Sequence, residues 1–238
     1  MLTELPVVAG LELAALYRPA ADSEVVGGDW YDAYPLPAVS GGAVTLAVSI
    51  GDIVGHDTTA ATLMGQWRSM LRQADVDHHP GLDPAGVVAA LEQANELLGI
   101  EAAGTLVHGH LRPVGDGTWE LTWTTAGHPR PLVREPDGTV RELAEADRMV
   151  AVGLSSRPRT THRTVVAPGS MLLLYTDGLV DQPGQDADAR AAEAIRSLAA
   201  HGTRPLPELV TQLAGRLAGP DPDDDVTLLA VRIPAKGA

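Results

Sequence analysis

The sequence predicts a layered α+β fold in which helices pack over sheets of mostly antiparallel strands. Two observations lead to this prediction. Short apolar runs, several of them rich in β-branched residues, alternate with segments that have helical spacing. Gly, Asp and Pro lie between consecutive runs in the second half of the chain, as turns between antiparallel strands require. No internal repeat or low-complexity linker divides the chain.

The apolar runs define the expected strands. AVTLAVSI is almost continuously apolar and β-branched, which is typical of a strand covered on both faces. The runs after Gly104 are separated by Gly-Asp-Gly, Gly-His-Pro and Pro-Asp-Gly turns. The expected strands are residues 11–18, 43–50, 105–112, 119–125, 131–134, 140–143, 171–175 and 226–233.

Four segments predict helices, at residues 58–73, 84–98, 187–200 and 206–217. The second has the clearest start, because Asp83 is a good N-cap and Pro84 occupies the first helical position. Its apolar residues recur on one face, so this helix should pack against a sheet.

Composition bounds the class of protein. With 238 residues the chain forms one large domain or two small ones. Its 45% apolar content includes no Phe, so the core must consist of Ala, Val, Leu and Ile. The formal net charge of −14 argues against nucleic acid or an anionic membrane as the main partner. The absence of Cys excludes disulfides, thiolate zinc sites and Cys nucleophiles.

The N-terminus lacks the basic and apolar regions of a signal peptide, and no apolar run approaches the length of a membrane span. We therefore expect a soluble, cytoplasmic protein.

Four groups of Asp lie at the ends of expected strands. Each group alone is typical of a turn or a solvated loop. Together, several carboxylates meeting at one edge would repel one another unless divalent cations neutralise them. Oxygen ligands without Cys favour Mg²⁺ or Mn²⁺ over Zn²⁺. The groups are Asp29 with Asp32, Asp52, Asp177, and Asp223 with Asp224 and Asp225.

Five ordered motifs carry a resemblance that runs from about residue 6 to residue 233. They are GGDWYD, GDIVGH, TTAGHPRPL, LLLYTDGLVD and DDDVTLLAVR. In this order and spacing the chain resembles the SpoIIE/RsbU-like branch of the PPM-type metal-dependent Ser/Thr protein phosphatases. The resemblance implies a single domain over residues 1–238, built as a four-layer α-β-β-α sandwich. It also implies two Mn²⁺ or Mg²⁺ ions at one end of the sheets, with a third, weaker site as an option.

The resemblance also implies roles for individual residues. Asp52 matches the carboxylate that bridges the two ions, and the carbonyl of Ile53 matches a backbone ligand. Asp177 and Asp224 match carboxylates of the second ion, and Asp29 matches the first acidic motif of the family. The neighbouring Asp32 and Asp225 would support the ligands or the fold.

Two departures from the family pattern bear on the site. The family shows Gly-His-Gly where this chain has Gly55-His56-Asp57, which adds a negative charge near the ions. Val54 stands two residues after Asp52, where larger relatives carry a His, and the phosphate-binding Arg near the first motif is also missing. We therefore expect the ions' waters and the backbone to hold the phosphate, and we assign no general acid.

The family's activity is hydrolysis of phosphoserine and phosphothreonine by a metal-activated water. The substrate it implies is a phosphorylated anti-sigma-factor antagonist with a STAS domain, in a partner-switching pathway. A homodimer or a separate regulatory protein is compatible with this role. Sensor domains are common in the family, and none precedes Pro6, so we expect a free-standing enzyme or a fragment of a longer protein. The helices at 58–73 and 84–98 would form a switch that completes the site.

Other readings of the same residues stay open. A phosphatase fold that only binds a partner is one alternative, for which the charge of Asp57 is the argument. A serine hydrolase using Ser49 with His128 is another, since AVSIG is close to a nucleophile elbow. We expect His128 to be structural. His108 and His110 share a strand face and could pair on a metal, but without a third ligand in view we expect two exposed histidines.

Overall fold

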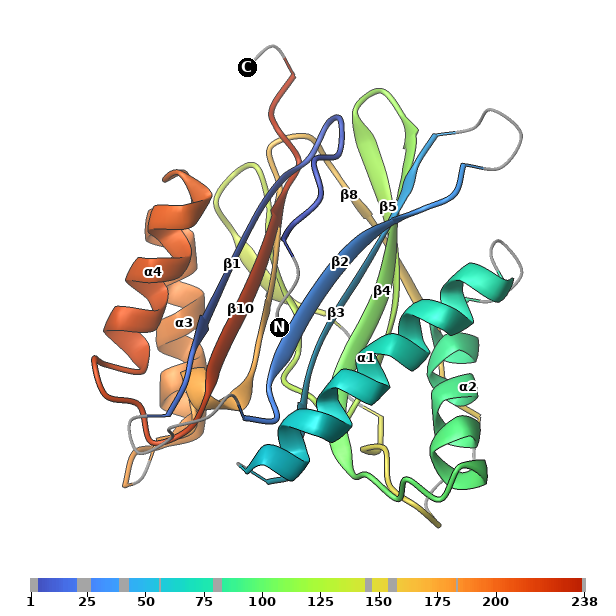
Figure 1. The fold of residues 1–238 in the computed structure, drawn as a ribbon. Coiled ribbons are helices and arrows are strands. Elements are labelled where there is room, and N and C mark those ends of the chain that lie inside the picture. The colour runs from blue at the N-terminus through green and yellow to red at the C-terminus, as the bar shows by residue number, and fades with distance from the viewer. Residues whose placement is uncertain are drawn as a thin grey trace.

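The structure is a computed structural model of the chain, and it describes residues 4–20, 27–38, 43–55, 57–78, 83–143, 147–153, 158–182 and 184–236. It contains two five-stranded sheets and four α-helices among these residues, arranged in four layers (Figure 1). The neighbouring strands of each sheet pair antiparallel. The predicted fold class is therefore confirmed.

The first sheet has the strand order β1-β10-β9-β6-β7 and the second the order β2-β3-β4-β5-β8. The strands of the first sheet are β1 (Glu12–Arg18), β6 (Leu132–Arg134), β7 (Val140–Glu142), β9 (Met171–Tyr175) and β10 (Val226–Arg232). Those of the second are β2 (Trp30–Leu36), β3 (Thr45–Ile53), β4 (Gly104–Gly115), β5 (Thr118–Ala126) and β8 (His162–Val166). A short 3₁₀ helix, η1 (Asp177–Leu179), follows β9.

One helix pair covers the outer face of each sheet (Figure 1). Helices α1 (Thr58–His78) and α2 (Pro84–Leu97) lie on the second sheet, and α3 (Ala187–His201) and α4 (Leu206–Leu217) lie on the first. Asp83 caps α2 as predicted, because its side chain accepts a hydrogen bond from the backbone N–H of Gly86.

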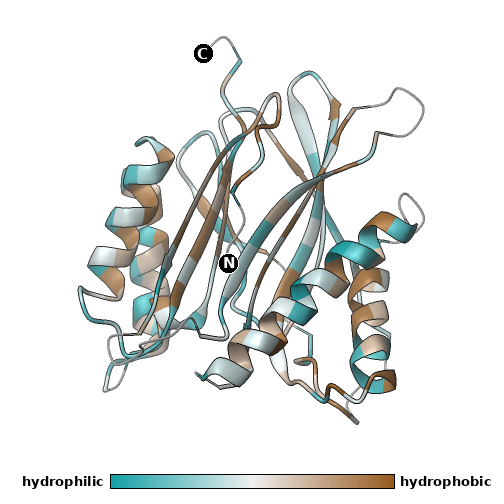
Figure 2. Cartoon of the chain, viewed as in Figure 1, coloured by the Kyte–Doolittle hydropathy of each residue, from teal (hydrophilic) through white to brown (hydrophobic). Residues whose placement is uncertain are grey.

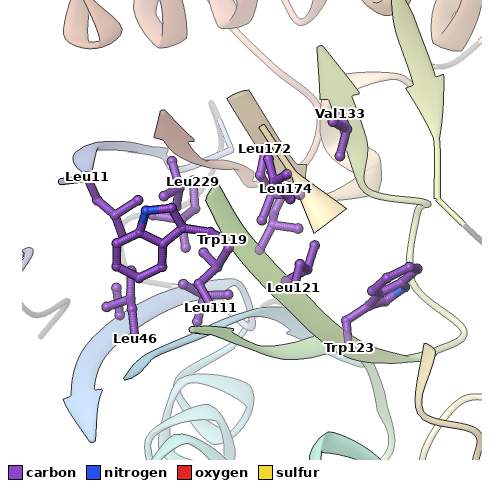
Figure 3. Close-up of a cluster of buried hydrophobic side chains, with 14 of the residues drawn as sticks. Leu11, Leu46, Leu111, Trp119, Leu121, Trp123, Val133, Leu172, Leu174 and Leu229 are labelled. Carbon is purple, nitrogen blue, oxygen red and sulfur yellow. The ribbon is translucent and has the colours of Figure 1, made fainter. Parts of the chain in front are cut away.

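The main core lies between the two sheets. Leu and Val side chains from both sheets fill it, together with Trp119 and Trp123 of β5 (Figure 3). Brown, apolar stretches run along β1 and β10 in Figure 2. Two further apolar clusters lie under the helix pairs, so each sheet is packed on both faces. Small aliphatic residues therefore replace the missing Phe.

The structure extends the sequence prediction at three places. Strand β2 was missed because WYDAYPL contains an acid and a proline, and β8 because it is a half-exposed strand at the edge of its sheet. Helix α1 continues past the predicted end at residue 73, through the buried Asp75. An acid at a buried position breaks the apolar pattern from which the helix end was predicted.

No helix in the described part of the chain combines the length and the apolar character that a membrane crossing requires.

The core between the sheets should be sensitive to loss of volume. Leu229 in β10 is fully buried within it. We expect Leu229→Ala to lower the free energy of unfolding by about 2–5 kcal/mol, because it removes apolar contacts and leaves a cavity. Chemical denaturation followed by circular dichroism measures this loss. The control is Leu97→Ala in α2, where the side chain is 75% exposed and the change should stay within about 0.5 kcal/mol. Equal effects of the two substitutions would contradict this assignment of the core.

Candidate metal centre

The predicted acidic residues lie where strands of both sheets end. Strands β2 and β3 pair with Trp30 opposite Gly51, which places Asp29 beside Asp52. Strands β9 and β10 pair with Tyr175 opposite Leu228, so the segments holding Asp177 and Asp224 run side by side. In Figure 1 this region is the lower end of the sheets, where β2, β10 and α1 begin.

A hydrogen bond joins the two sheets at this end. Thr176, the residue before Asp177, donates from its hydroxyl to Oδ2 of Asp29 at 2.7 Å. The same hydroxyl accepts the backbone N–H of Thr227 at 2.9 Å. Because Asp29 precedes a strand of the second sheet and Thr176 follows a strand of the first, this contact fixes the relative position of the two acidic pairs.

Two glycines allow the backbone to approach the acids. A Cβ at Gly28 would lie 2.2 Å from the carbonyl oxygen of Ile53 and 2.8 Å from Oδ1 of Asp52. A Cβ at Gly178 would lie 2.1 Å from the carbonyl oxygen of Asp225. No side chain fits at these distances, which explains physically why Gly stands beside Asp in the GGD and TDG motifs.

Burial and mutual repulsion raise the pKa values of the clustered acids. Burial, followed by the charges of Asp177, Asp224 and Asp225, raises the pKa of Asp52 to about 8. Burial and then the charge of Asp224 raise the pKa of Asp177. Burial and then the charge of Asp52 raise the pKa of Asp29 well above its ordinary value. Ionising the cluster therefore costs free energy, and a bound cation would offset that cost.

The donor set of the acidic cluster suits hard divalent cations. All the side-chain donors here are carboxylate oxygens, and the carbonyl of Ile53 adds another oxygen, a set that suits Mg²⁺ or Mn²⁺. Among the described residues, no three of these acids bring oxygens within 4.8 Å of one another.

Asp225 and Asp32, the acids next to the predicted ligands, have different surroundings in the structure. Asp225 belongs to the cluster, where it accepts hydrogen bonds from the hydroxyl of Tyr17 at 3.1 Å and from the backbone N–H of Ala20 at 3.0 Å. Asp32 faces α1, where Arg72 binds both of its carboxylate oxygens at 2.6 Å. Asp32 therefore connects β2 to α1 rather than contributing to the acidic cluster.

Asp57 has a structural role in the sequence Gly55-His56-Asp57. Its carboxylate accepts the backbone N–H of Ala60 at 2.9 Å, so it caps the start of α1. The left-handed backbone in this turn is at Gly55, with a φ of 114°. His56 lies outside the described residues. The carboxylate of Asp57 thus satisfies one of the unpaired N–H groups at the start of the helix, which gives this residue a structural role.

Ser49 and His128 do not form a hydrolase site. Ser49 is 1% exposed in the middle of β3 and accepts a hydrogen bond from Nε1 of Trp30. It therefore lies inside a strand, not on an exposed turn. His128 is buried with its Nδ1 2.8 Å from the hydroxyl of Thr105, and burial lowers its pKa to about 3. This neutral, hydrogen-bonded ring agrees with the expected structural role.

The expectation of two exposed histidines on β4 was wrong. His108 is fully buried, and His110 is 9% exposed. They share a face, as predicted, but α1 covers that face and brings Asp75 against both rings. The third partner was missed because Asp75 lies beyond the predicted end of the helix.

Sequence reasoning also missed two residues that hold the acids in place. These are Thr176, bound to Asp29, and Tyr17, bound to Asp225. Thr176 directly precedes Asp177 in the TDG motif, which was a usable signal. Tyr17 lies more than 200 residues from Asp225, and nothing in its local sequence marks it.

The sequence matches one known protein family over most of its length. Residues 42–234 match the family model described as Stage II sporulation protein E (SpoIIE). The chain belongs to the SpoIIE family. This confirms the resemblance inferred from the five motifs, and with it the assignment to the PPM-type Ser/Thr protein phosphatases.

Individual relatives agree with this assignment. The chain is 26% identical to Protein IcfG of Synechocystis, over 95% of this chain and 38% of IcfG. It is 30% identical to the solved RsbU and RsbW domains of Rv1364c from Mycobacterium tuberculosis, with a TM-score of 0.84 over 98% of this chain and 63% of that one. It is 25% identical to the SiaA-PP2C domain of Pseudomonas aeruginosa, with a TM-score of 0.67 over 92% of this chain and 85% of that one. The chain thus spans less than two thirds of the first two relatives.

The raised pKa values predict how the metal-free protein responds to pH. Unfolded Asp loses its proton near pH 4, whereas folded Asp52 keeps it up to about pH 8. The folded state therefore binds more protons in this window, and its stability should fall as the pH rises from about 4 to 8. In EDTA at pH 8, we expect Asp52→Asn to exceed the wild type by about 1–3 kcal/mol in free energy of unfolding.

Urea unfolding in EDTA at several pH values measures this difference. The matched control is Asp116→Asn, in the turn between β4 and β5 at the opposite end of the sheet, where stability should match the wild type at each pH. A wild type and an Asp52→Asn variant whose stabilities fall in parallel with pH would disprove the repulsion at this site.

Proposed function

We propose that the chain is a Mn²⁺- or Mg²⁺-dependent phosphoserine/phosphothreonine protein phosphatase. The observation that supports the proposal most is the meeting of acids from four chain segments at one end of two sheets, where they raise one another's pKa values. Part-buried carboxylates that repel one another lower the stability of a fold, and in a metal enzyme the same carboxylates bind the cations. Family membership agrees with this reading. The phosphatase domain would comprise about residues 6–233.

The ligand assignment follows the motifs and the geometry together. Asp52 and the carbonyl of Ile53 would hold the ions from β3, with Asp29 beside them on the second sheet. Asp177 and Asp224 would hold them from the first sheet. When bound, a pair of such ions supplies Lewis acidity toward the phosphoryl group and a water of lowered pKa.

The chain's own residues supply orientation. Thr176 fixes Oδ2 of Asp29 by its hydrogen bond and so orients this carboxylate beside Asp52. The backbone N–H of Gly178 donates to Oδ1 of Asp177 at 3.0 Å and holds that carboxylate at the start of η1. Tyr17 and the backbone of Ala20 hold both oxygens of Asp225, so this residue contributes charge to the cluster while fixed in place.

A phosphorylated STAS-domain antagonist of an anti-sigma factor is the proposed substrate, in partner-switching signalling. Support comes from the similarity to the RsbU domain of Rv1364c, which is part of the same polypeptide as an RsbW domain.

The proposed ligands predict a loss of activity on neutral substitution. We expect Asp52→Asn and Asp177→Asn to lower kcat/KM by at least about 100-fold, since even residues that only support a metal ligand typically contribute 10–100-fold. Hydrolysis of p-nitrophenyl phosphate and of a phosphoserine protein, each with Mn²⁺, measures the effect. Asp116→Asn, far from the site, should retain wild-type turnover. Full activity of Asp52→Asn or Asp177→Asn would reject the ligand assignment.

The substrate proposal has a separate test. A STAS-domain protein phosphorylated on serine should lose its phosphate in the presence of Mn²⁺, and addition of EDTA should stop the reaction. Release of inorganic phosphate measures it. Activity toward p-nitrophenyl phosphate without any toward phosphorylated STAS domains would keep the enzyme assignment and reject this substrate.

A further inference from the structure

A second group of possible metal ligands lies away from the acidic end of the sheets. Asp75 of α1 contacts His108 and His110 of β4 between the helix and the sheet. Nε2 of His110 is 2.7 Å from Oδ1 of Asp75, and Nε2 of His108 is 3.1 Å from Oδ2. Among the described residues, this is the group of three whose donor atoms all lie within 4.8 Å of one another.

The strand register explains why the two imidazoles meet the helix. Residues two apart on a strand share a face, and on β4 this face carries His108 and His110 toward α1. His108 pairs with Ser49 on β3 and with Thr124 on β5, so it sits in the middle of the sheet. The ligand set thus connects a helix to a central strand.

Unsatisfied polar atoms in this layer indicate a missing ligand. His108 is 0% exposed; its Nε2 lies 3.1 Å from Oδ2 of Asp75, and its Nδ1 has no hydrogen-bond partner within the described residues. The hydroxyl of Thr124, on the opposite strand position, is also buried without a hydrogen-bond partner. Buried polar atoms without partners are rare, and a bound ion or water is a common explanation.

We propose that Asp75, His108 and His110 bind one divalent cation of the Zn²⁺ class at a structural site that fastens α1 to the sheet. Two imidazoles and one carboxylate are a common ligand set for Zn²⁺, and imidazole selects late first-row metals over Mg²⁺. Ligand atoms around a tetrahedral Zn²⁺ lie about 3.3 Å apart, so small side-chain shifts from the observed contacts would admit the ion. Asp75 is 2% exposed and His108 0%, burial that suits a structural ion rather than a substrate site.

Tyr34 supports the carboxylate of this site. Its hydroxyl donates to Oδ2 of Asp75 at 2.6 Å, and the ring of Tyr34 is covered by the guanidinium of Arg72 at 4.6 Å. Such a hydrogen bond to a ligating carboxylate fixes its orientation and typically contributes 10–100-fold to metal affinity. The side chain of His110 is 11% exposed, which gives the site a point of contact with solvent.

The experiment uses the full chain, stripped of metal and then held in excess Mg²⁺ so that the oxygen-rich acidic site is filled. Co²⁺ is then titrated as a spectroscopic substitute for Zn²⁺, because its visible bands are far stronger in four- or five-coordinate sites than in six-coordinate oxygen sites. We expect one equivalent of Co²⁺ to produce strong bands and Zn²⁺ to displace it. Absence of these bands in the wild type would overturn the proposal and leave a hydrogen-bonded or hydrated Asp-His-His cluster.

Variants assign the bands to residues. His108→Gln should abolish them, and Tyr34→Phe should lower Co²⁺ affinity by about 10–100-fold. The matched control, His201→Gln at the end of α3, should bind like the wild type. Equal spectra for the wild type and His108→Gln would overturn the proposal. X-ray absorption of the wild-type Zn²⁺ protein provides a test that needs no variant: imidazole scattering supports the site, and an oxygen-only shell contradicts it.

Discussion

Repulsion among buried carboxylates at the meeting point of two sheets is the constraint on which this structure depends. Separately, each acid is an ordinary turn residue. The sandwich brings them together and holds them against their own charge through the contact of Thr176 with Asp29 and of Tyr17 with Asp225. The Thr176–Asp29 contact joins the two sheets at the point of repulsion, and the Tyr17–Asp225 contact holds Asp225 within the first sheet.

The aliphatic core makes such a connection possible. Leu and Val side chains fill the space between the sheets, and two tryptophans on β5 close it without any Phe. Close packing allows little displacement of one sheet relative to the other. Strand ends are therefore fixed in space, and Gly28 and Gly178 let neighbouring backbone reach the acids at distances that no side chain would allow.

The sequence predicted the layers, most strands and the acidic cluster, because apolar periodicity and Asp-Gly turns are local signals. Contacts between distant segments carry no such signal. Asp32 and Asp29 occupy the same motif, yet strand alternation turns Asp32 toward Arg72 of α1, and Asp57 proved to be a helix cap. His108 and His110 looked exposed because α1 was predicted to end before Asp75. The burial of an acidic residue can be predicted only once the residues that pair with it are known.

The way α1 rests on its sheet bears on the expected switch. Polar contacts hold much of the helix face: Arg72 binds the fully buried Asp32, and Asp75 contacts two buried imidazoles. Arg68, one turn before Arg72 on the same helix, also pairs with Asp32 at 3.7 Å. Separating α1 from the sheet would leave Asp32 buried without either arginine, which costs about 3–5 kcal/mol for a typical buried ion pair. Because its cap, Asp57, lies four residues after Ile53, any change of position would be transmitted directly to the proposed ligands, and a partner that moves α1 must supply compensating contacts to Asp32.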